Sequence, residues 1–298
     1  MFRINIMRKT IICIAWALAV LACLSCSREA RVMARHVPER ADDFVFENNL
    51  IAGRIYGQAL EGNPTSPGID IWVKLPGKLV ANEWYSHIGE NGNEGYYHHD
   101  HGGKDCYKVA VSLGGGATSP LVNGKLMLPV TNWRSYEILE QSADKIVFVL
   151  NYPQWDCDSI SVSLSKKITV VPDTYFLKCE DCYTFSGTDS LMIAAGIIRH
   201  AKMNTIEAEQ FSDGLYAIWE QASDQHVEPE DGRIGVGIYV PGATLCGIAE
   251  NEVHGLCGKK IASGETFTYW FGNCWSKGDI KSADAWFGKC NELKEIYK

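Results

Sequence analysis

Short apolar stretches separated by glycine, proline, asparagine and aspartate run through most of this 298-residue chain. Residues 69–74 alternate strictly between apolar and polar side chains, and residues 107–113 do the same. Alternation with a period of two indicates strands that present one face to a core. Further strand candidates are 126–130, 145–152, 159–164, 167–171, 175–179, 191–198, 215–219, 234–240, 244–249 and 266–271. With no helical segments between them, these strands predict a large antiparallel β-sandwich and argue against βαβ units.

One helix is expected at the carboxyl end. Trp286, Cys290, Leu293 and Tyr297 fall at helical spacing, and Ser282 is suited to be the N-cap. We therefore expect an amphipathic helix that packs on a sheet. No linker, charge block or internal repeat divides the body, so residues 44–298 are predicted to form a single, mainly β domain.

The amino terminus is predicted to be a lipoprotein signal peptide. Residues 1–25 combine an early basic region with an apolar run that ends in small residues and cysteine. Cys26 is the expected lipidation site, with Cys23 as the alternative, and a plain secretory signal remains the other interpretation. A polar lead-in follows at residues 26–43. The mature protein is thus expected to be exported and anchored by lipid at the outer membrane, in the periplasm or at the cell surface.

The charge balance and the missing motifs exclude several classes of function. With 28 Lys and Arg against 36 Asp and Glu, the formal charge is −8, and no basic run exists that would bind a nucleic-acid backbone. The chain also lacks a Gly-x-Ser-x-Gly elbow, a dinucleotide fingerprint, a kinase motif set and an HExxH helix. Nucleic acid is therefore not an expected partner, and those enzyme classes are disfavoured.

Four of the eight histidines lie within residues 87–101. Histidine moves protons near neutral pH and neighbouring carboxylates orient it, so this density favours an acid–base site. In an extended backbone His98 and Asp100 would share one side, and His99 and His101 the other. A solvated, histidine-rich loop is the alternative.

The His99-x-His101 spacing also fits a divalent metal, with Asp105 or the distant His200 as further ligands. This spacing alone is a weak signal, so no cofactor is expected and a metal stays an alternative. The run of glycines at 114–116 lacks the ending of a phosphate loop and predicts close backbone packing or a tight turn.

Ionisable and aromatic groups elsewhere also suit a polar ligand. Arg199 and His200 end a predicted strand, although a buried, hydrogen-bonded histidine explains His200 equally well. Glu220 and Trp270 are suited to line a sugar-binding groove, and core packing is the alternative for both.

A set of short motifs lies in the first half of the mature chain. It consists of Arg40 with Asp42-Asp43-Phe44, Glu47-Asn48, Arg54-x-Tyr56-Gly57, Gly68-Ile69-Asp70-x-Trp72-x-Lys74, Tyr97-His98-x-Asp100-His101-Gly102 with Asp105, Tyr107-x-Val109 and Gly114-x-Gly116. These motifs resemble a family of exported bacterial proteins known as a domain of unknown function, the DUF4861 type, often encoded beside polysaccharide-degrading enzymes. The second half, from residue 167 to His200, resembles galactose-mutarotase-like supersandwiches, a fold shared by sugar epimerases, glycoside hydrolases and polysaccharide lyases.

The resemblance implies a carbohydrate ligand and a role in polysaccharide use. The expected activity is that of a lyase, epimerase or hydrolase on an oligosaccharide or uronic-acid sugar, and a non-catalytic glycan-binding lipoprotein is the alternative. The expected catalytic residues are His98, Asp100, His101, His200 and Asp105, with His101 and His200 as the proton-transferring pair. The expected substrate-binding residues are Arg54, Tyr56, Asp70, Trp72, Lys74, Tyr97, Tyr107, Arg199, Glu220 and Trp270.

Overall fold

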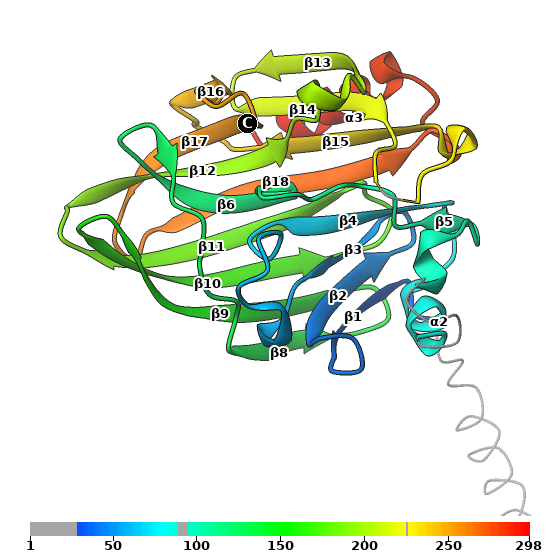
Figure 1. Ribbon diagram of the computed structural model, residues 1–298, viewed down its shortest axis with the longest axis horizontal. Coiled ribbons are helices and arrows are strands. Elements are labelled where there is room, and N and C mark those ends of the chain that lie inside the picture. Colours follow the sequence, from blue (N-terminus) through cyan, green and yellow to red (C-terminus); the bar gives the residue numbers. More distant parts are fainter. Residues whose placement is uncertain (1–28, 89–94, 225) are drawn as a thin grey trace, which may run out of the picture. The chain divides into compact units, whose positions relative to one another are not determined.

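The computed structural model describes residues 29–88, 95–224 and 226–298 (Figure 1). Arg31–Lys298 forms one compact unit. The predicted signal peptide and its lipidation candidates, Cys23 and Cys26, lie outside the described residues. Among the helices that are described, none is long and apolar enough to cross a membrane.

The largest element is an eight-stranded antiparallel sheet with the order β13-β14-β15-β18-β11-β10-β9-β8. Its strands are β8 (Ser135–Gln141), β9 (Ile146–Cys157), β10 (Ile160–Val170), β11 (Phe176–Ser186), β13 (Ile206–Ser212), β14 (Leu215–Gln221), β15 (Arg233–Tyr239) and β18 (Thr266–Trp275).

Two five-stranded sheets pack on this large sheet, with the orders β1-β2-β3-β4-β5 and β16-β17-β12-β6-β7. Their strands are β1 (Val32–Val37), β2 (Asp43–Asn48), β3 (Ala52–Ile55), β4 (Ile69–Lys74), β5 (Gly103–Lys104), β6 (Gly115–Val122), β7 (Lys125–Leu126), β12 (Ser190–Ile198), β16 (Leu245–Ile248) and β17 (His254–Ala262). A parallel bridge between Ile69 and Gly114 joins the two small sheets. Phe46 of β2 meets Phe271 of β18, with ring centroids 5.7 Å apart, and this contact lies in the core between the layers.

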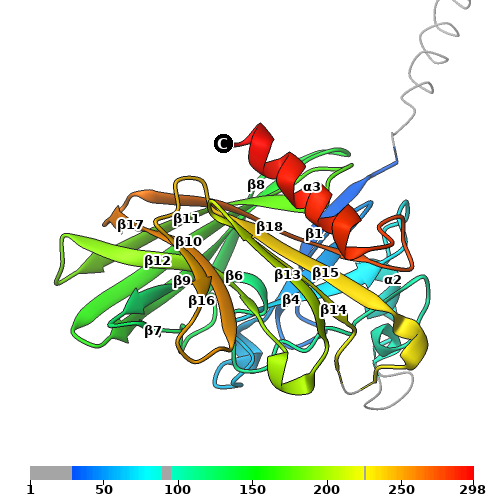
Figure 2. The ribbon, with the colours of Figure 1, turned by 90° about the horizontal axis from the view of Figure 1, so that it is seen from above.

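Within the described residues the helices are few, and all but the last are short. They are α2 (Ala81–Ser86), α3 (Ala283–Ile296) and the 3₁₀ turns η1 (Gln58–Leu60), η2 (Tyr96–His98), η3 (Ala201–Met203) and η4 (Pro229–Asp231). Ser282 caps α3, because its hydroxyl accepts the backbone N–H of Ala285 at 3.3 Å. Figure 2 shows α3 on one side of the large sheet, where Trp286 donates its indole N–H to the carbonyl of Val236. The predicted antiparallel β-sandwich with a carboxyl-terminal helix is confirmed.

The sheet β1–β5 is covered on both faces. Phe44, Phe46 and Ile71 point into the main core, while Val45 and Trp72 join a second apolar cluster beneath α2 and η2. Alternation along a strand sends its polar residues to that second face as well, so charged side chains become buried there. This burial of charge on the outer face of the sheet positions the candidate site.

Several predicted elements differ from the structure. Residues 107–113 do not form a strand: Tyr107 makes only an isolated bridge with Ser223, and residues 110–113 form turns, because Ala110 takes a positive φ of 49° that breaks the extended backbone. The strand expected at 126–130 ends with β7 at Leu126, since Pro129 has no N–H to donate to a ladder. Part of the lead-in expected at 26–43 is β1, which pairs with β2, so regular structure begins before residue 44.

The glycines at 114–116 pack closely against other strands, as predicted. Gly114 has a φ of +58°, and a Cβ built on it would lie 2.2 Å from the carbonyl oxygen of Ile69. A Cβ on Gly116 would lie 2.5 Å from the Cβ of Phe271. Larger residues at these two positions would therefore separate the sheets.

His254 makes the stability of the fold depend on pH. Its Nε2 accepts the backbone N–H of Leu113 at 3.1 Å, and burial lowers its pKa to about 4 from 6.5. Between these pH values the unfolded chain binds a proton that the folded protein does not, so the stability falls as the pH drops. We expect the free energy of unfolding to fall by about 3 kcal/mol more in wild type than in His254→Gln between pH 7 and pH 4. Urea unfolding at both pH values measures this difference, and parallel pH profiles would contradict the assignment.

Candidate functional site

A cavity of about 240 Å³ opens at the outer face of β3 and β4. It is lined by Arg40, Arg54, Tyr56, Thr65, Asp70, His98, Asp105, Tyr107, Lys108, Val109, Ala110 and Asp224. Six of the predicted site residues meet here: Arg54, Tyr56, Asp70, His98, Asp105 and Tyr107. Because these residues come from β3, β4, η2 and the segment after β5, the fold assembles the cavity from separate parts of the chain.

Arg54 lies at the centre of the buried charges. Its Nε donates to Oδ2 of Asp70 at 2.7 Å, and its Nη2 donates to Oδ2 of Asp105 at 3.0 Å. Its Nη1 lies 3.5 Å from Oδ2 of Asp43, and the hydroxyl of Tyr56 donates to Asp70 at 2.9 Å. A single guanidinium therefore orients three carboxyl groups.

Aromatic rings enclose this guanidinium. The Cζ atom of Arg54 lies 5.3 Å from the ring centroid of Trp72, 5.1 Å from that of Tyr97 and 5.4 Å from that of Tyr56. Trp72 stacks on Tyr97 and is fully buried. Trp72 and Tyr97, which we expected to bind substrate, thus hold Arg54 in place and do not line the cavity.

The charges balance only if one carboxyl group carries a proton. Arg40 and Arg54 bring two positive charges to Asp43, Asp70 and Asp105. Burial raises the pKa of Asp105 well above its usual range, and the neighbouring Asp70 carboxylate raises it further. Burial raises the pKa of Asp70 to a smaller extent, because Arg54 and Tyr56 stabilise its charged form. Of these carboxyl groups, Asp105 is therefore the one whose surroundings most favour the protonated form.

The pKa of His98 is shifted in the opposite direction to that of Asp105. Burial, followed by the charges of His226 and Arg54, lowers the pKa of His98 to about 4. The imidazole is therefore neutral near pH 7 and able to accept a proton. The rings of His98 and His226 lie 4.7 Å apart between their centroids, which brings the segment after β14 to the same cavity.

His200 supports the rim of the cavity. Its Nδ1 lies 2.8 Å from Oε1 of Glu220, its Nε2 lies 2.7 Å from the carbonyl of Lys108, and its ring meets Tyr107 edge-on at 5.4 Å. Burial lowers the pKa of His200, but the hydrogen bond and charge of Glu220 outweigh burial and raise it overall. Both ring nitrogens are engaged, so His200 and Glu220 are placed as supports for Tyr107 and Lys108 and do not line the cavity.

The other predicted members of the histidine cluster lie elsewhere. The 3₁₀ turn η2 replaces the expected extended backbone. His98 and Asp100 therefore line different cavities and do not share one side of a strand. His101 is exposed and stacks on Tyr96 with centroids 3.7 Å apart. Asp100 pairs with Lys277 at 2.8 Å and lines a second cavity of about 320 Å³ together with His99. The structure therefore does not bring His101 and His200 together as lining residues of one cavity.

Three expected substrate-binding residues have structural partners away from the cavity. Lys74 is buried against Glu47, whose carboxylate also accepts the first backbone N–H groups of α2. Arg199 binds both carboxylate oxygens of Glu209, at 2.6 and 2.8 Å. Trp270 is buried and stacks on Tyr297 at 4.4 Å. None of these three lines the cavity around Arg54.

The described residues hold no group of three or more His, Cys, Asp or Glu side chains that could bind a metal ion. The ring centroids of His99 and His101 lie 6.5 Å apart, and their planes are inclined at 66°. The metal alternative therefore has no assembled ligand set within the described part of the chain.

Sequence reasoning did not assign four ionisable residues to the site, namely Arg40, Asp43, Lys108 and Asp224. Asp43, Val45 and Glu47 lie at every second position of β2 and therefore share one face. This period-two pattern was the sequence signal that could have placed Asp43 beside the site. Lys108 and Asp224 lie outside regular strands, so no period marked them.

The chain matches the DUF4861 family, described as a domain of unknown function, over residues 22–297. It belongs to this family. A protein of Formosa agariphila described as uncharacterized protein P7 is 30% identical over 217 residues, which cover 70% of this chain. The chain spans about half of that relative's length, 51%.

Solved structures share weaker similarity with this DUF4861 member. A GH36 α-galactosidase, AgaB, of Geobacillus stearothermophilus matches at 8% identity and a TM-score of 0.37, covering 82% of this chain and 41% of the enzyme. A galactose mutarotase related enzyme of Lactobacillus acidophilus matches at 8% identity and a TM-score of 0.27, covering 78% of this chain and 97% of that chain.

Proposed function

We propose that this protein is a carbohydrate-active enzyme that cleaves uronic-acid-containing oligosaccharides by acid–base chemistry. One observation carries the proposal: Asp105 and His98 line the same cavity, and their surroundings shift their pKa values in opposite directions. A protonated carboxyl group and a neutral imidazole in one site form an acid and a base that are both ready at neutral pH.

The proposed reaction is a β-elimination. His98 accepts the proton of the sugar carbon next to the carboxylate, and the electron pair of that C–H bond forms a carbon–carbon double bond. The bond from the adjacent carbon to the glycosidic oxygen breaks, and Asp105 donates its proton to that oxygen. The products are an unsaturated sugar and a free hydroxyl group, so atoms and charge balance.

Cations at the cavity suit an acidic sugar. Arg40 and Lys108 line its rim, and both carry positive charge that can pair with a substrate carboxylate. Negative charge developing next to that carboxylate in the transition state is stabilised by the same groups. A bound carboxylate beside His98 also raises the pKa of the imidazole and makes it a stronger base.

Turnover of defined substrates tests the proposal. Wild type is incubated with oligosaccharides of galacturonic, glucuronic and mannuronic acid, and the ultraviolet absorbance of the unsaturated product is followed. We expect His98→Ala to lose turnover, and His101→Ala, which alters an exposed ring on Tyr96, to retain a larger share. Calorimetric binding of these sugars without any product would favour the glycan-binding alternative, and absence of turnover on the whole panel would refute the enzyme assignment.

A further inference from the structure

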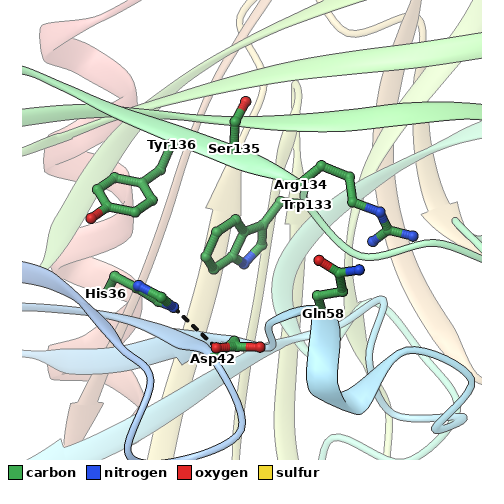
Figure 3. A pocket seen from close by; sticks show the side chains of 7 residues that line it. All are labelled: His36, Asp42, Gln58, Trp133, Arg134, Ser135 and Tyr136. Atoms are coloured by element: carbon green, nitrogen blue, oxygen red, sulfur yellow. Dashed lines mark ion pairs between the residues drawn. The ribbon is translucent and has the colours of Figure 1, made fainter.

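A separate cavity of about 330 Å³ lies beside the amino-terminal end of β8 (Figure 3). Trp133 and Tyr136 line it from β8 and the residue pair before that strand, and His36, Asp42 and Gln58 line it from the β1–β2 hairpin and η1. Its volume lies in the range of roughly 300–1,000 Å³ that is usual for small-molecule sites. The proposed acid–base reaction uses none of these residues.

Tyr136 provides a fixed aromatic surface in this cavity. The ring of Tyr136 packs against the rings of Phe44, His36 and Trp133, with centroid distances of 5.3, 5.5 and 6.0 Å. The residue is nevertheless 44% exposed. An aromatic ring that is held by neighbours and open on one side is suited to stack on the apolar face of a sugar ring.

Trp133 contributes a hydrogen-bond donor that the protein does not use. The residue is only 5% exposed, and its buried Nε1 has no acceptor among the described residues. In Figure 3 the nitrogen-bearing edge of the indole faces the space between Asp42 and Gln58. A buried donor without a partner costs free energy unless a ligand or water satisfies it.

Trp133 differs from the other tryptophans in where its unsatisfied donor lies. The indole N–H groups of Trp155, Trp275 and Trp286 each donate to a backbone carbonyl. Those of Trp72 and Trp84 also lack an acceptor, but both side chains are fully buried in the closed cluster beneath α2. Trp133 differs because its unsatisfied donor belongs to a residue that lines a cavity.

The polar lining favours a ligand rich in hydroxyl groups. Nε2 of His36 lies 3.4 Å from Oδ1 of Asp42, and the guanidinium of Arg134 is paired with Glu61. These pairs leave acceptors and donors around the cavity but little net charge. A pyranose ring presents both hydroxyl groups and an apolar face, so it matches the two kinds of lining.

The cavity adjoins the candidate site along two parts of the chain. Arg40 and Tyr56 line the candidate site, and Asp42 and Gln58, two residues further along in each case, line this cavity. We infer that this cavity is a second carbohydrate subsite, which holds a further pyranose unit of the same oligosaccharide against Tyr136, with Trp133 Nε1 donating to a ring hydroxyl. This inference rests on the proposed function.

Binding measurements on three variants test the subsite. The probes are hexasaccharides of galacturonic, glucuronic and mannuronic acid and, as neutral probes, galactan and xylan hexasaccharides. We expect Tyr136→Ala to weaken binding of the best probe by about three- to tenfold in calorimetry. Trp133→Phe, which keeps a ring but removes the donor, is expected to weaken it as well. Tyr297→Ala is the matched control, because Tyr297 is 46% exposed and lies outside this cavity.

The indole ¹H–¹⁵N cross-peak of Trp133 separates this inference from the proposed function. A shift of that cross-peak on adding the probe, lost in Tyr136→Ala, supports the subsite even if no probe is cleaved. Turnover with an unmoved Trp133 cross-peak, and with equal affinity in wild type and Tyr136→Ala, would refute the subsite and leave the enzyme assignment intact. If no probe binds at all, both are refuted.

Discussion

Asp105→Asn is expected to lower kcat for β-elimination by about 10²- to 10⁴-fold, the usual contribution of a positioned general acid. The asparagine amide has the same shape as the carboxyl group, and its oxygen still accepts the Nη2–H of Arg54. It cannot, however, transfer a proton to the leaving oxygen. Steady-state kinetics on the best uronic-acid substrate measures the loss, with Asp213→Asn as the control, because Asp213 is an exposed aspartate that does not line the cavity.

The pH profile distinguishes loss of the acid from general damage. In wild type, kcat/KM, which reports the free enzyme, rises as the pH passes about 4, because His98 then becomes neutral and able to accept a proton. It falls at higher pH, where the raised pKa of Asp105 is passed and the proton is lost. Asp105→Asn should retain the acidic limb and lack the alkaline limb. An alkaline limb that survives in the variant would assign it to another group.

The same variant should not be less stable at neutral pH. Burial disfavours the charged form of Asp105, and an amide avoids that cost while keeping the hydrogen bond to Arg54. Urea unfolding of Asp105→Asn therefore serves as the check that a loss of kcat is chemical. A large loss of stability would show that the carboxyl group is needed for the fold.

Strands with long apolar runs could be predicted from sequence, whereas the strands that fall outside the expected ranges are β1, β2, β3, β5, β6, β8, β13 and β17. Strands such as β4 and β18 carry apolar runs that a core requires. In β2 and β3, by contrast, Asp43, Glu47 and Arg54 occupy fully or nearly buried positions. Buried charge on these strands needs a cover made by α2 and η2 and partners from elsewhere in the chain. A local sequence pattern shows neither the covering helices nor the distant partners of these charges. The segment before residue 44 was therefore predicted to be a polar lead-in.

The candidate site was predictable in composition but not in arrangement. The histidine density pointed to residues 98–101, yet η2 directs only His98 into the cavity around Arg54. The pairing of Arg54 with Asp70 follows from strand register, because these residues lie opposite each other on β3 and β4. Without the register, sequence reasoning could name both residues but not the pair. His200 was equally compatible with catalysis and burial until both of its nitrogens were accounted for.

Arg54→Met is expected to lower the free energy of unfolding by about 3–5 kcal/mol, because it leaves buried carboxyl groups without their main partner. Methionine keeps much of the side-chain volume between Trp72 and Tyr97, so lost packing contributes little. Arg233→Met removes an exposed arginine that pairs with Glu207, and this control should cost under about 1 kcal/mol.

Changing the charge of the carboxyl groups, by pH or by mutation, tests why Arg54→Met loses stability. If uncompensated carboxylates destabilise Arg54→Met, the loss should be smaller at pH 5 than at pH 8, because burial has raised the pKa values of Asp43 and Asp70 and protonation removes their charge. Adding Asp70→Asn to Arg54→Met should restore part of the stability at pH 8. Urea unfolding of both variants at the two pH values decides the matter. An equal loss at both pH values, with no recovery in the double variant, would mean that Arg54 stabilises the fold by packing between its aromatic neighbours and not by balancing the carboxyl groups.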